Sequence, residues 1–326
     1  MARISVKSRL LELLEQNRGI TISGEQMARE LDCTRAAVWK AVKALQQEGY
    51  EIEAGLNKGY MLSEDNNILA EEGIRPLLRQ PEVYLKLYQE TDSTNRAAKQ
   101  VAIAGEAGHG SVILACGQSC GRGRRGRSFY SPSQAGLYLS VILQPQGNLR
   151  ESLLLTTEAA VAVYKAVRKI TGIELDIKWV NDLYYKGKKV CGILTEAITD
   201  FESGEIQYAV VGIGLNLYEE EGGYPPELRE IAGGLYRNQR EAEGVNRNRL
   251  AAEIVNCLLD ETRELKLLPE YLDRNMIPGH RIQILDGQQS RSAYAVAICQ
   301  DGRLKVREED GSETLLAYGE ISVIVE

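Results

Sequence analysis

The sequence predicts an α+β protein of several domains: an N-terminal winged helix-turn-helix, a central α/β domain around one mixed sheet, and a small C-terminal β-barrel. Three observations predict this order. Helical patterns and a hairpin pattern occupy residues 1–64, helices and strands alternate over 65–273, and only short strands follow over 274–326. A length of 326 residues, about two to three times that of a typical domain, fits several separate cores.

Three helices are expected in the first domain. Leucines between positions 10 and 14 mark one face of a helix over residues 4–17, which ends at Arg18-Gly19. Ser23 followed by Gln26 is a capping-box pattern and predicts the start of a second helix. Thr34 can cap a third helix. The apolar stripe that this third helix must pack inward is Val38, Ala41, Val42 and Leu45.

The outer face of the third helix carries cations, and no acid precedes Glu48. Behind it, alternating apolar residues over 52–56, turn residues over 57–59 and a return over 60–62 predict a hairpin wing. Such a helix can enter the major groove of double-stranded DNA. A module that only dimerises or covers another domain is the alternative. The residues expected to contact DNA are Arg35, Ala36, Lys40, Lys43 and Lys58.

The charge distribution agrees with a nucleic-acid site near the N-terminus. The whole chain has a formal net charge of −7, which argues against nonspecific wrapping of nucleic acid by the entire molecule. Residues 1–62 hold nine Lys or Arg against eight Asp or Glu, so the negative charge lies in the remainder.

The polar patch 63–67 is expected to be a short linker that ends the first domain. In the central domain an amphipathic helix is predicted over 157–170 and is stopped by Gly172. Strands are expected over 111–115, 137–143, 175–179, 190–195 and 206–217. After Pro278-Gly279, the Asp-Gly pairs at 286, 301 and 310 predict hairpins of a small barrel.

The strongest local pattern is the arginine loop, residues 117–127, which holds four glycines and four arginines and no acid. Glycine lets the backbone approach a ligand closely, and guanidinium groups donate paired hydrogen bonds to phosphate or carboxylate. An RGG-like contact with RNA is the alternative, which a single short loop between two strands disfavours.

Two further segments point to an anion site. Lys178 begins the sequence KWVND at the end of a predicted strand, where a lysine can reach a phosphate, although a lone lysine is more often a surface residue. The sequence GIGLN at 212–216 places two glycines in an apolar strand, where they could leave room for a flat ligand. There is neither a Walker A motif nor a GxGxxG that opens a helix, so an ordinary P-loop or dinucleotide domain is not expected.

Metal binding by protein side chains is not predicted. The six cysteines are scattered, and His109 and His280 lack metal-ligand spacing, so both histidines are interpreted as surface residues. Cys116 and Cys120 are expected to pack. We expect free thiols, a cytoplasmic location and no membrane partner, because no apolar signal core or membrane-length run occurs.

Taken together, these motifs resemble the bifunctional biotin protein ligases that also act as biotin operon repressors. Val180 stands where the family usually has proline, and Phe129 where it usually has tryptophan; neither change removes a functional group. The matching residues are 23–42, Asp92-Ser93-Thr94-Asn95, Gln118, 121–127, Ser131-Pro132, 137–140, KWVND, Gly192-Ile193-Leu194, GIGLN and Gly319-Glu320-Ile321-Ser322.

The resemblance implies an activity. Biotin and ATP, with Mg²⁺, would form biotinyl-5′-AMP, and biotin would then pass to a lysine of the biotin carboxyl carrier domain of acetyl-CoA carboxylase or a similar enzyme. It also implies a central domain resembling class II aminoacyl-tRNA synthetases and an SH3-like last domain. Lys178 and Arg122 are the expected catalytic residues. Biotin would be bound by Ser93, Thr94, Asn95, Gln118, Arg122, Gly123, Arg124 and Lys178, and the nucleotide by Arg124, Arg125, Arg127, Asn181 and Asn216.

The resemblance further implies a homodimer in the adenylate-bound state that represses biotin genes at a DNA operator. Two other functions stay open at this point. One is a ligase of the lipoyl or octanoyl class, which the complete arginine loop and the winged domain disfavour. The other is a transcription factor whose enzyme core is only a ligand sensor, which the retention of Lys178 and all four loop arginines disfavours.

Overall fold

A computed structural model describes residues 5–55, 59–144, 152–199, 206–286, 289–317 and 322–325. Contacts divide the chain into two compact units. The first comprises Met1–Pro81 with Glu243–Glu253, and the second comprises Glu82–Ala242 with Ile254–Glu326. The domain boundaries expected at 64 and 273 stay predictions. Lys58, Leu56 and the segment 319–321 lie outside the described residues.

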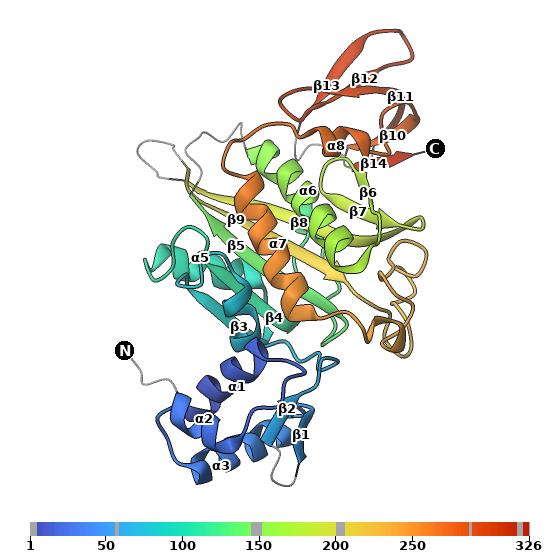
Figure 1. Ribbon diagram of the computed structural model, residues 1–326. Helices are drawn as coiled ribbons and strands as arrows, with labels where there is room; N and C mark the ends of the chain where they lie inside the picture. Colours follow the sequence, from blue (N-terminus) through green and yellow to red (C-terminus); the bar gives the residue numbers. More distant parts are fainter. Residues whose placement is uncertain are drawn as a thin grey trace. The chain divides into compact units, whose positions relative to one another are not determined.

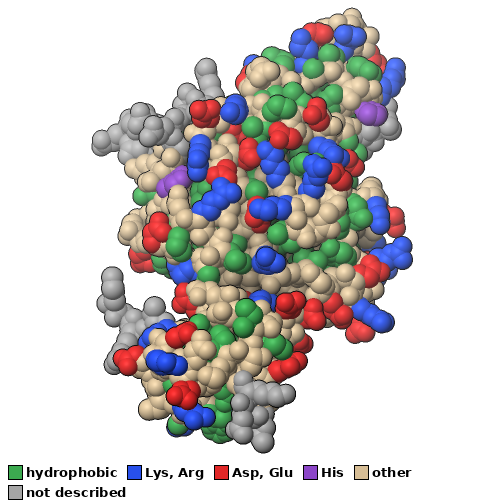
Figure 2. Space-filling model, in the orientation of Figure 1, with side chains coloured by type: hydrophobic (Ala, Val, Ile, Leu, Met, Phe, Trp, Pro, Cys, Tyr) green, Lys and Arg blue, Asp and Glu red, His purple; other side chains and the backbone are tan. Residues whose placement is uncertain are grey.

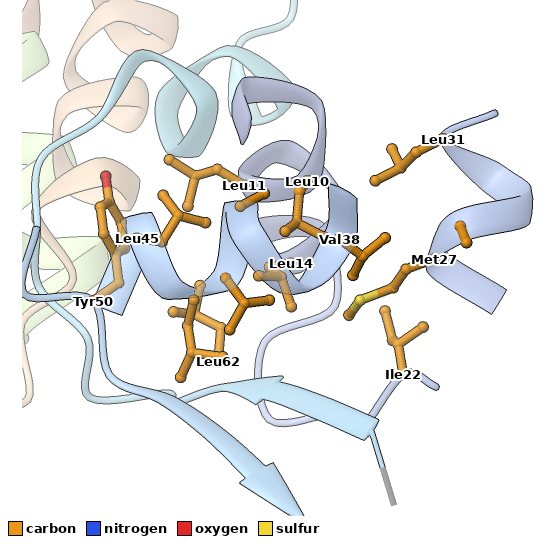
Figure 3. Close-up of a cluster of buried hydrophobic side chains, with 14 of the residues drawn as sticks. Leu10, Leu11, Leu14, Ile22, Met27, Leu31, Val38, Leu45, Tyr50 and Leu62 are labelled. Carbon is orange, nitrogen blue, oxygen red and sulfur yellow. The ribbon is translucent and has the colours of Figure 1, made fainter. Parts of the chain in front are cut away.

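The first unit has the three expected helices and the hairpin, and its core is drawn in Figure 3. Leu10 and Leu14 point from the first helix toward Val38 and Leu45 of the third, and all four are fully buried, which confirms the predicted stripe. The elements of this unit are α1 (Val6–Gln16), α2 (Gly24–Glu30), α3 (Arg35–Gln47), β1 (Ile52–Gly55), β2 (Gly59–Leu62), α4 (Glu71–Ile74) and η1 (Arg75–Leu77). Strands β1 and β2 pair antiparallel.

Side-chain caps fix where the helices of this unit begin. The hydroxyl of Ser23 accepts from Gln26 N at 3.1 Å, and that of Thr34 accepts from Ala37 N at 3.2 Å, as predicted. In a full capping box the side-chain oxygen of Gln26 would also accept from Ser23 N. Among the described residues this second bond is not formed; the Gln26 amide nitrogen donates to Glu30 Oε1 at 2.9 Å, one turn later.

The polar patch 63–67 is tied to the first unit. Asn66 is buried; its carbonyl accepts from Arg18 Nη1 at 2.6 Å, and its side-chain oxygen accepts from Glu51 N at 3.2 Å. Neighbouring Asn67 accepts from Arg247 of the same unit. These hydrogen bonds show that the segment is folded against its neighbours and is not a free tether.

The second unit is built on a seven-stranded mixed sheet, shown in green and yellow in Figure 1. Its order is β3-β4-β5-β9-β8-β7-β6, with only the β3–β4 pair parallel. The mixed sheet is therefore confirmed. The strands are β3 (Leu85–Thr91), β4 (Val112–Gln118), β5 (Gly136–Leu143), β6 (Asp176–Lys178), β7 (Asp182–Tyr185), β8 (Lys188–Thr199) and β9 (Ile206–Asn216). The sequence did not predict β3 and β7.

Helices cover both faces of this sheet. Neighbouring side chains of β8 separate them: Thr195 bonds Thr156 of α6, whereas Glu196 bonds Asn95 of α5. Because successive strand residues point to opposite faces, α5 and α6 lie on opposite sides. The helices are α5 (Thr94–Ile103), η2 (Arg124–Gly126), α6 (Ser152–Thr171), η4 (Arg240–Ala242), α7 (Arg247–Glu261) and α8 (Pro269–Asp273). Gly172, at φ +74°, follows α6 as expected.

The C-terminal part of the second unit is a five-stranded antiparallel sheet with the order β13-β12-β11-β10-β14. Gly302 and Gly311 adopt φ of +81° and +84° in the turns that their Asp-Gly pairs predicted. The strands are β10 (Arg281–Asp286), β11 (Gln289–Ile298), β12 (Leu304–Arg307), β13 (Glu313–Leu316) and β14 (Ser322–Val325).

Acidic and basic side chains are interspersed on the face that Figure 2 draws. Within the described part of the chain, no helix combines the length and the apolar run that crossing a bilayer requires. All six cysteines are free thiols, as expected.

Candidate functional site

A cavity of about 590 Å³ lies in the second unit, and several parts of the chain line it. They include the start of α5, the arginine loop, the turn between β6 and β7, and the middle of β8 and of β9. These five parts all carry segments that the sequence analysis quoted. The cavity therefore gathers residues that lie more than a hundred positions apart.

One wall of the cavity is polar and surrounds the start of α5. Ser93 is the N-cap residue in extended backbone, but its hydroxyl makes no capping bond. Thr94 donates to Gln118 Oε1 from its backbone nitrogen at 2.9 Å and from its hydroxyl at 3.2 Å. Gln118 in turn donates to Ser131 Oγ at 2.9 Å. This chain of bonds fixes the Gln118 amide at the end of β4.

Asn95 continues the polar wall and is almost completely buried, with 3% of its surface exposed. Its Nδ2 donates to Leu194 O at 3.2 Å and to Glu196 Oε2 at 2.9 Å, and its Oδ1 accepts from Ser140 Oγ at 2.6 Å. A Cβ atom at Gly212 would lie 2.0 Å from Asn95 Oδ1. Glycine at 212 is therefore required for Asn95 to occupy this place.

The arginine loop contributes cations to the lining of the cavity. It folds back on itself through Gly123 N, which donates to Arg127 O at 2.7 Å, and Arg125 takes a left-handed conformation at φ +57°. Arg124 donates to Asn181 Oδ1 at 2.9 Å, and Arg122 lies 3.5 Å from Glu196 Oε1. Both arginines line the cavity, although 42% of the Arg122 side chain is still exposed.

Lys178 supplies a further cation from the end of β6. Burial lowers the pKa of its ammonium group, the Asp182 carboxylate opposes that shift, and the Lys189 charge adds to it. The ammonium lies 5.6 Å from the ring centre of Tyr184, and Lys189 pairs with Asp182 at 2.7 Å. The Asp182 carboxylate thus interacts with both lysines.

The turn that carries Lys178 is anchored from two directions. The indole nitrogen of Trp179 donates to Gly302 O at 2.9 Å, and the hydroxyl of Tyr271 donates to Val180 O at 2.9 Å. Trp179 is 5% exposed and Tyr271 is fully buried. The C-terminal sheet therefore takes part in holding the KWVND turn.

The structure brings together nearly all of the predicted site residues. All of the residues assigned to biotin line the cavity, as do Arg125, Arg127 and Asn181 of those assigned to the nucleotide. Asn216 does not line it: this side chain is buried and donates to Gly233 O at 3.1 Å. Arg35, Ala36, Lys40 and Lys43 are exposed on α3 of the first unit.

The glycines of GIGLN line the cavity, and the protein's own side chains pack closely on them: a Cβ at Gly214 would lie 2.5 Å from the Phe129 ring, and one at Gly212 would meet Asn95. Room for a flat ligand there stays a prediction. Cys116 is buried as expected, but the expectation that Cys120 packs is wrong, because this residue is exposed. Both histidines are exposed, as expected.

Sequence reasoning did not assign Glu196, Ser140 or Lys189 to the site. Glu196 and Lys189 flank the segment Gly192-Ile193-Leu194, and Ser140 ends the segment 137–140. Both quoted segments therefore lie close to the residues that were not assigned. What was lacking was the strand register, which pairs Ile193 with Ile213 and Ser140 with Gly212. Among the described residues, no group of three or more His, Cys, Asp or Glu could hold a metal ion.

Comparison with known proteins agrees with both parts of the chain. A family model described as the biotin/lipoate A/B protein ligase family matches residues 87–216, and one described as an HTH domain matches residues 6–61. The bifunctional ligase/repressor BirA of Bacillus spizizenii is 33% identical over 319 residues, covering 95% of this chain and 96% of that protein. The chain belongs to the family of bifunctional ligase/repressors.

Other members and structures extend the comparison. BirA of Escherichia coli is 29% identical, and the match covers 92% of each chain. The structure of the biotin protein ligase from Aquifex aeolicus in complex with biotin and ATP superposes with a TM-score of 0.60 at 25% identity. It covers 74% of this chain and 99% of that one. The chain thus combines a ligase fold with an N-terminal helix-turn-helix, as the family name states.

We expect Gly214→Ala to destabilise the second unit, because the new methyl group and the Phe129 ring cannot both occupy their present places. Overpacking of this kind costs about 1 to 3 kcal/mol. Chemical denaturation followed by circular dichroism measures it. Gly108→Ala is the matched control, since nothing lies within 4 Å of its Cβ position. Equal loss of stability in both variants would contradict the assigned contact.

Proposed function

We propose that the chain is a biotin protein ligase that forms biotinyl-5′-AMP from biotin and ATP, releases pyrophosphate, and transfers biotin to a lysine of a biotin carboxyl carrier domain. The observation that carries this proposal is one cavity lined both by polar side chains at Ser93–Asn95 and by cations at Arg122–Arg124 and Lys178. The polar side chains suit a neutral ring with polar edges. The cations suit a carboxylate and phosphates. Adenylate formation by purified protein, biotin and ATP tests it.

The cations that line the cavity fit the chemistry of the first step. A carboxylate is a poor electrophile until it is adenylylated, and its oxygen attacks the α-phosphorus while pyrophosphate leaves. Negative charge gathers on the phosphoryl oxygens during this step, where Lys178 and Arg124 can offset it. Arg122 and the loop around it would then cover the adenylate and keep water from the anhydride.

For biotin we keep Ser93, Thr94, Asn95 and Gln118, which would supply hydrogen bonds to the ureido ring and the carboxylate, together with Arg122, Gly123, Arg124 and Lys178. For the nucleotide we keep Arg124, Arg125, Arg127 and Asn181, which line the cavity. Asn216 would act only through the Gly233 backbone that it holds.

Magnesium would be carried mainly by the ATP phosphates. Mg²⁺ is often held by one or two carboxylates together with substrate phosphates, and it keeps several waters. Asp182 is a carboxylate of this kind in the cavity, next to Lys178. When bound, the ion would supply charge neutralisation at the phosphates.

Lipoate or octanoate ligation is the second candidate, because the matching family model covers both ligase classes. The 33% identical relative is named a ligase/repressor, and the helix-turn-helix match favours the same function. Direct binding of biotin against lipoate separates the two. We also propose an SH3-like closure of the C-terminal sheet, a likeness of the central sheet to class II aminoacyl-tRNA synthetases, and a cytoplasmic location, which the free thiols support.

Lys178→Ala should lower the rate of adenylate formation about 100- to 1000-fold, the usual effect of removing one preorganised charge. Pyrophosphate release at saturating biotin and ATP measures it. Because the ammonium is charged only below its pKa and burial lowers that pKa, the wild-type rate should fall at a lower alkaline pH than an ordinary lysine would give. Lys178→Arg should keep the charge at higher pH. An alanine variant within threefold of wild type would assign Lys178 no catalytic part.

For the first unit we propose binding to a double-stranded DNA operator through the exposed face of α3. Arg35, Ala36, Lys40 and Lys43 share this exposed face, while Val38 and Leu45 on the opposite side are fully buried. A helix held by its buried stripe and presenting cations can lie in the major groove. Operator binding by the full chain measured at several salt concentrations tests this.

Replacing Lys40 and Lys43 by alanine should weaken operator binding and flatten its salt dependence. Each lost phosphate contact lowers the slope of log K against log salt by about one unit. Lys266→Ala is the control, since its side chain is 60% exposed and belongs to the second unit. A slope unchanged by the double substitution would mean that this face does not meet DNA.

We further propose that biotinyl-AMP acts as corepressor by favouring a homodimer. A single α3 offers three cations, Arg35, Lys40 and Lys43, and a two-fold dimer on a palindromic operator would double its contacts. The adenylate can drive this only if it binds the dimer-competent state more tightly. Unbiotinylated carrier would consume the adenylate and return the protein to the monomer.

Sedimentation and operator titration should therefore respond to ligands together. Apo protein should be mainly monomeric and bind weakly, whereas biotin plus ATP should give dimer and tight binding. With biotin alone we expect a result between these two. Equal dimerisation and equal operator affinity in all three conditions would overturn the link and leave a ligase fused to a DNA-binding unit.

A further inference from the structure

Glu196, on β8, joins the polar wall of the cavity to the arginine loop. Its Oε1 pairs with Lys99 Nζ at 2.5 Å and lies 3.5 Å from Arg122 Nη1, while its Oε2 accepts from Asn95 Nδ2 at 2.9 Å. The side chain is 19% exposed, against 42% for Arg122. Three donors from two elements thus converge on one largely buried carboxylate that no motif had identified.

The charge state of Glu196 decides which end of the Asn95 amide faces it. Burial alone would raise the pKa of the Glu196 carboxyl, but hydrogen bonds from Lys99 and Asn95 hold it below its ordinary value. An ionised carboxylate can accept hydrogen bonds and cannot donate them. The nitrogen of Asn95 must therefore face Glu196. Leu194 O, which also only accepts, takes the second proton of that nitrogen at 3.2 Å.

With both of its N–H groups engaged, Asn95 offers the cavity only its oxygen. An amide oxygen has two lone pairs, and Ser140 Oγ occupies one at 2.6 Å. Asn95 lines the cavity, and Gly212 leaves the space in which its oxygen sits. We propose that Glu196 is a positioning residue that fixes Asn95 as a hydrogen-bond acceptor for an N–H group of the ligand ring.

This inference rests on the proposed function and deepens it, because it explains which ring the site selects. The ureido ring of biotin carries two N–H donors, whereas the dithiolane ring of lipoate carries none. A buried acceptor left without its donor is costly, and sites built on such pairs reject the analogue strongly. Glu196 therefore acts on ring selection through Asn95, without touching the ligand.

The test is biotin binding by the full chain, measured by isothermal titration calorimetry for four proteins: wild type, Glu196→Gln, Lys99→Met and the double variant. In Glu196→Gln the single amide oxygen turns to the nearby Lys99 ammonium, so its NH₂ group faces Asn95. Two donors then oppose each other, and Asn95 must rotate and present its own NH₂ to the ligand. We expect biotin affinity to fall about 10-fold or more.

The double variant makes the result specific. Without the Lys99 ammonium, the side-chain amide oxygen introduced by E196Q is free to accept from Asn95 again, because Arg122 is farther away and more exposed. We expect K99M with E196Q to recover most of the lost biotin affinity, and K99M alone to stay near wild type. The KM for biotin should rise in Glu196→Gln, while the KM for ATP should not.

Several results would overturn the inference. These are biotin affinity of Glu196→Gln within twofold of wild type, a double variant that binds no better than Glu196→Gln, or equal rises in the KM for biotin and ATP. A general loss of folding cannot imitate the expected pattern, since adding a second substitution would not restore binding. A wild-type protein that binds lipoate but not biotin would overturn the proposed function first.

Discussion

The cavity gathers several cations in one partly buried space, and their mutual repulsion is the constraint to which the surrounding structure responds. Four of these cations have a partner supplied by another part of the chain: Arg122 has Glu196, Arg124 has Asn181, Lys189 has Asp182, and Lys178 has the Tyr184 ring. Such partners hold the guanidinium and ammonium groups in place. The contacts of Arg122, Arg124 and Lys178 are the weaker ones, because Asn181 and Tyr184 are neutral and Arg122 lies 3.5 Å from its carboxylate.

Side chains also pack closely on the central strands of the sheet, which explains the glycines there. Gly212 and Gly214 of β9 admit Asn95 and the Phe129 ring, and Gly192 of β8 lies beneath the same ring. An alanine at any of the three would push a wall of the cavity. Glycine at these positions therefore sets the shape of the cavity, because the missing side chains leave space for Asn95 and the Phe129 ring.

Local sequence patterns predicted much of the fold. The remaining features of the site depend on pairing between segments that are distant in sequence. The helices of the first unit, the Asp-Gly turns and the mixed sheet follow from periodicity and turn chemistry, because each depends on neighbours in sequence. The role of Glu196 depends on which residue of α5 lies over β8, a long-range register that no local pattern encodes. The neighbours of the GIGLN glycines could not be predicted for the same reason, since they are residues 95 and 129.

The two anion sites that we propose on this chain would have to avoid competing for the same ligand, and the charge pattern provides the means. The excess negative charge lies outside residues 1–62, so a long polyanion is repelled from most of the second unit, while cations of that unit line a cavity. A small anion can enter such a cavity, but a duplex cannot. The exposed face of α3 lies in a segment without that negative excess, as the proposed binding of DNA requires. Under the two proposals, a recessed cationic site would take a mononucleotide and an exposed cationic face would take DNA, so shape would separate two ligands that share the same phosphate chemistry.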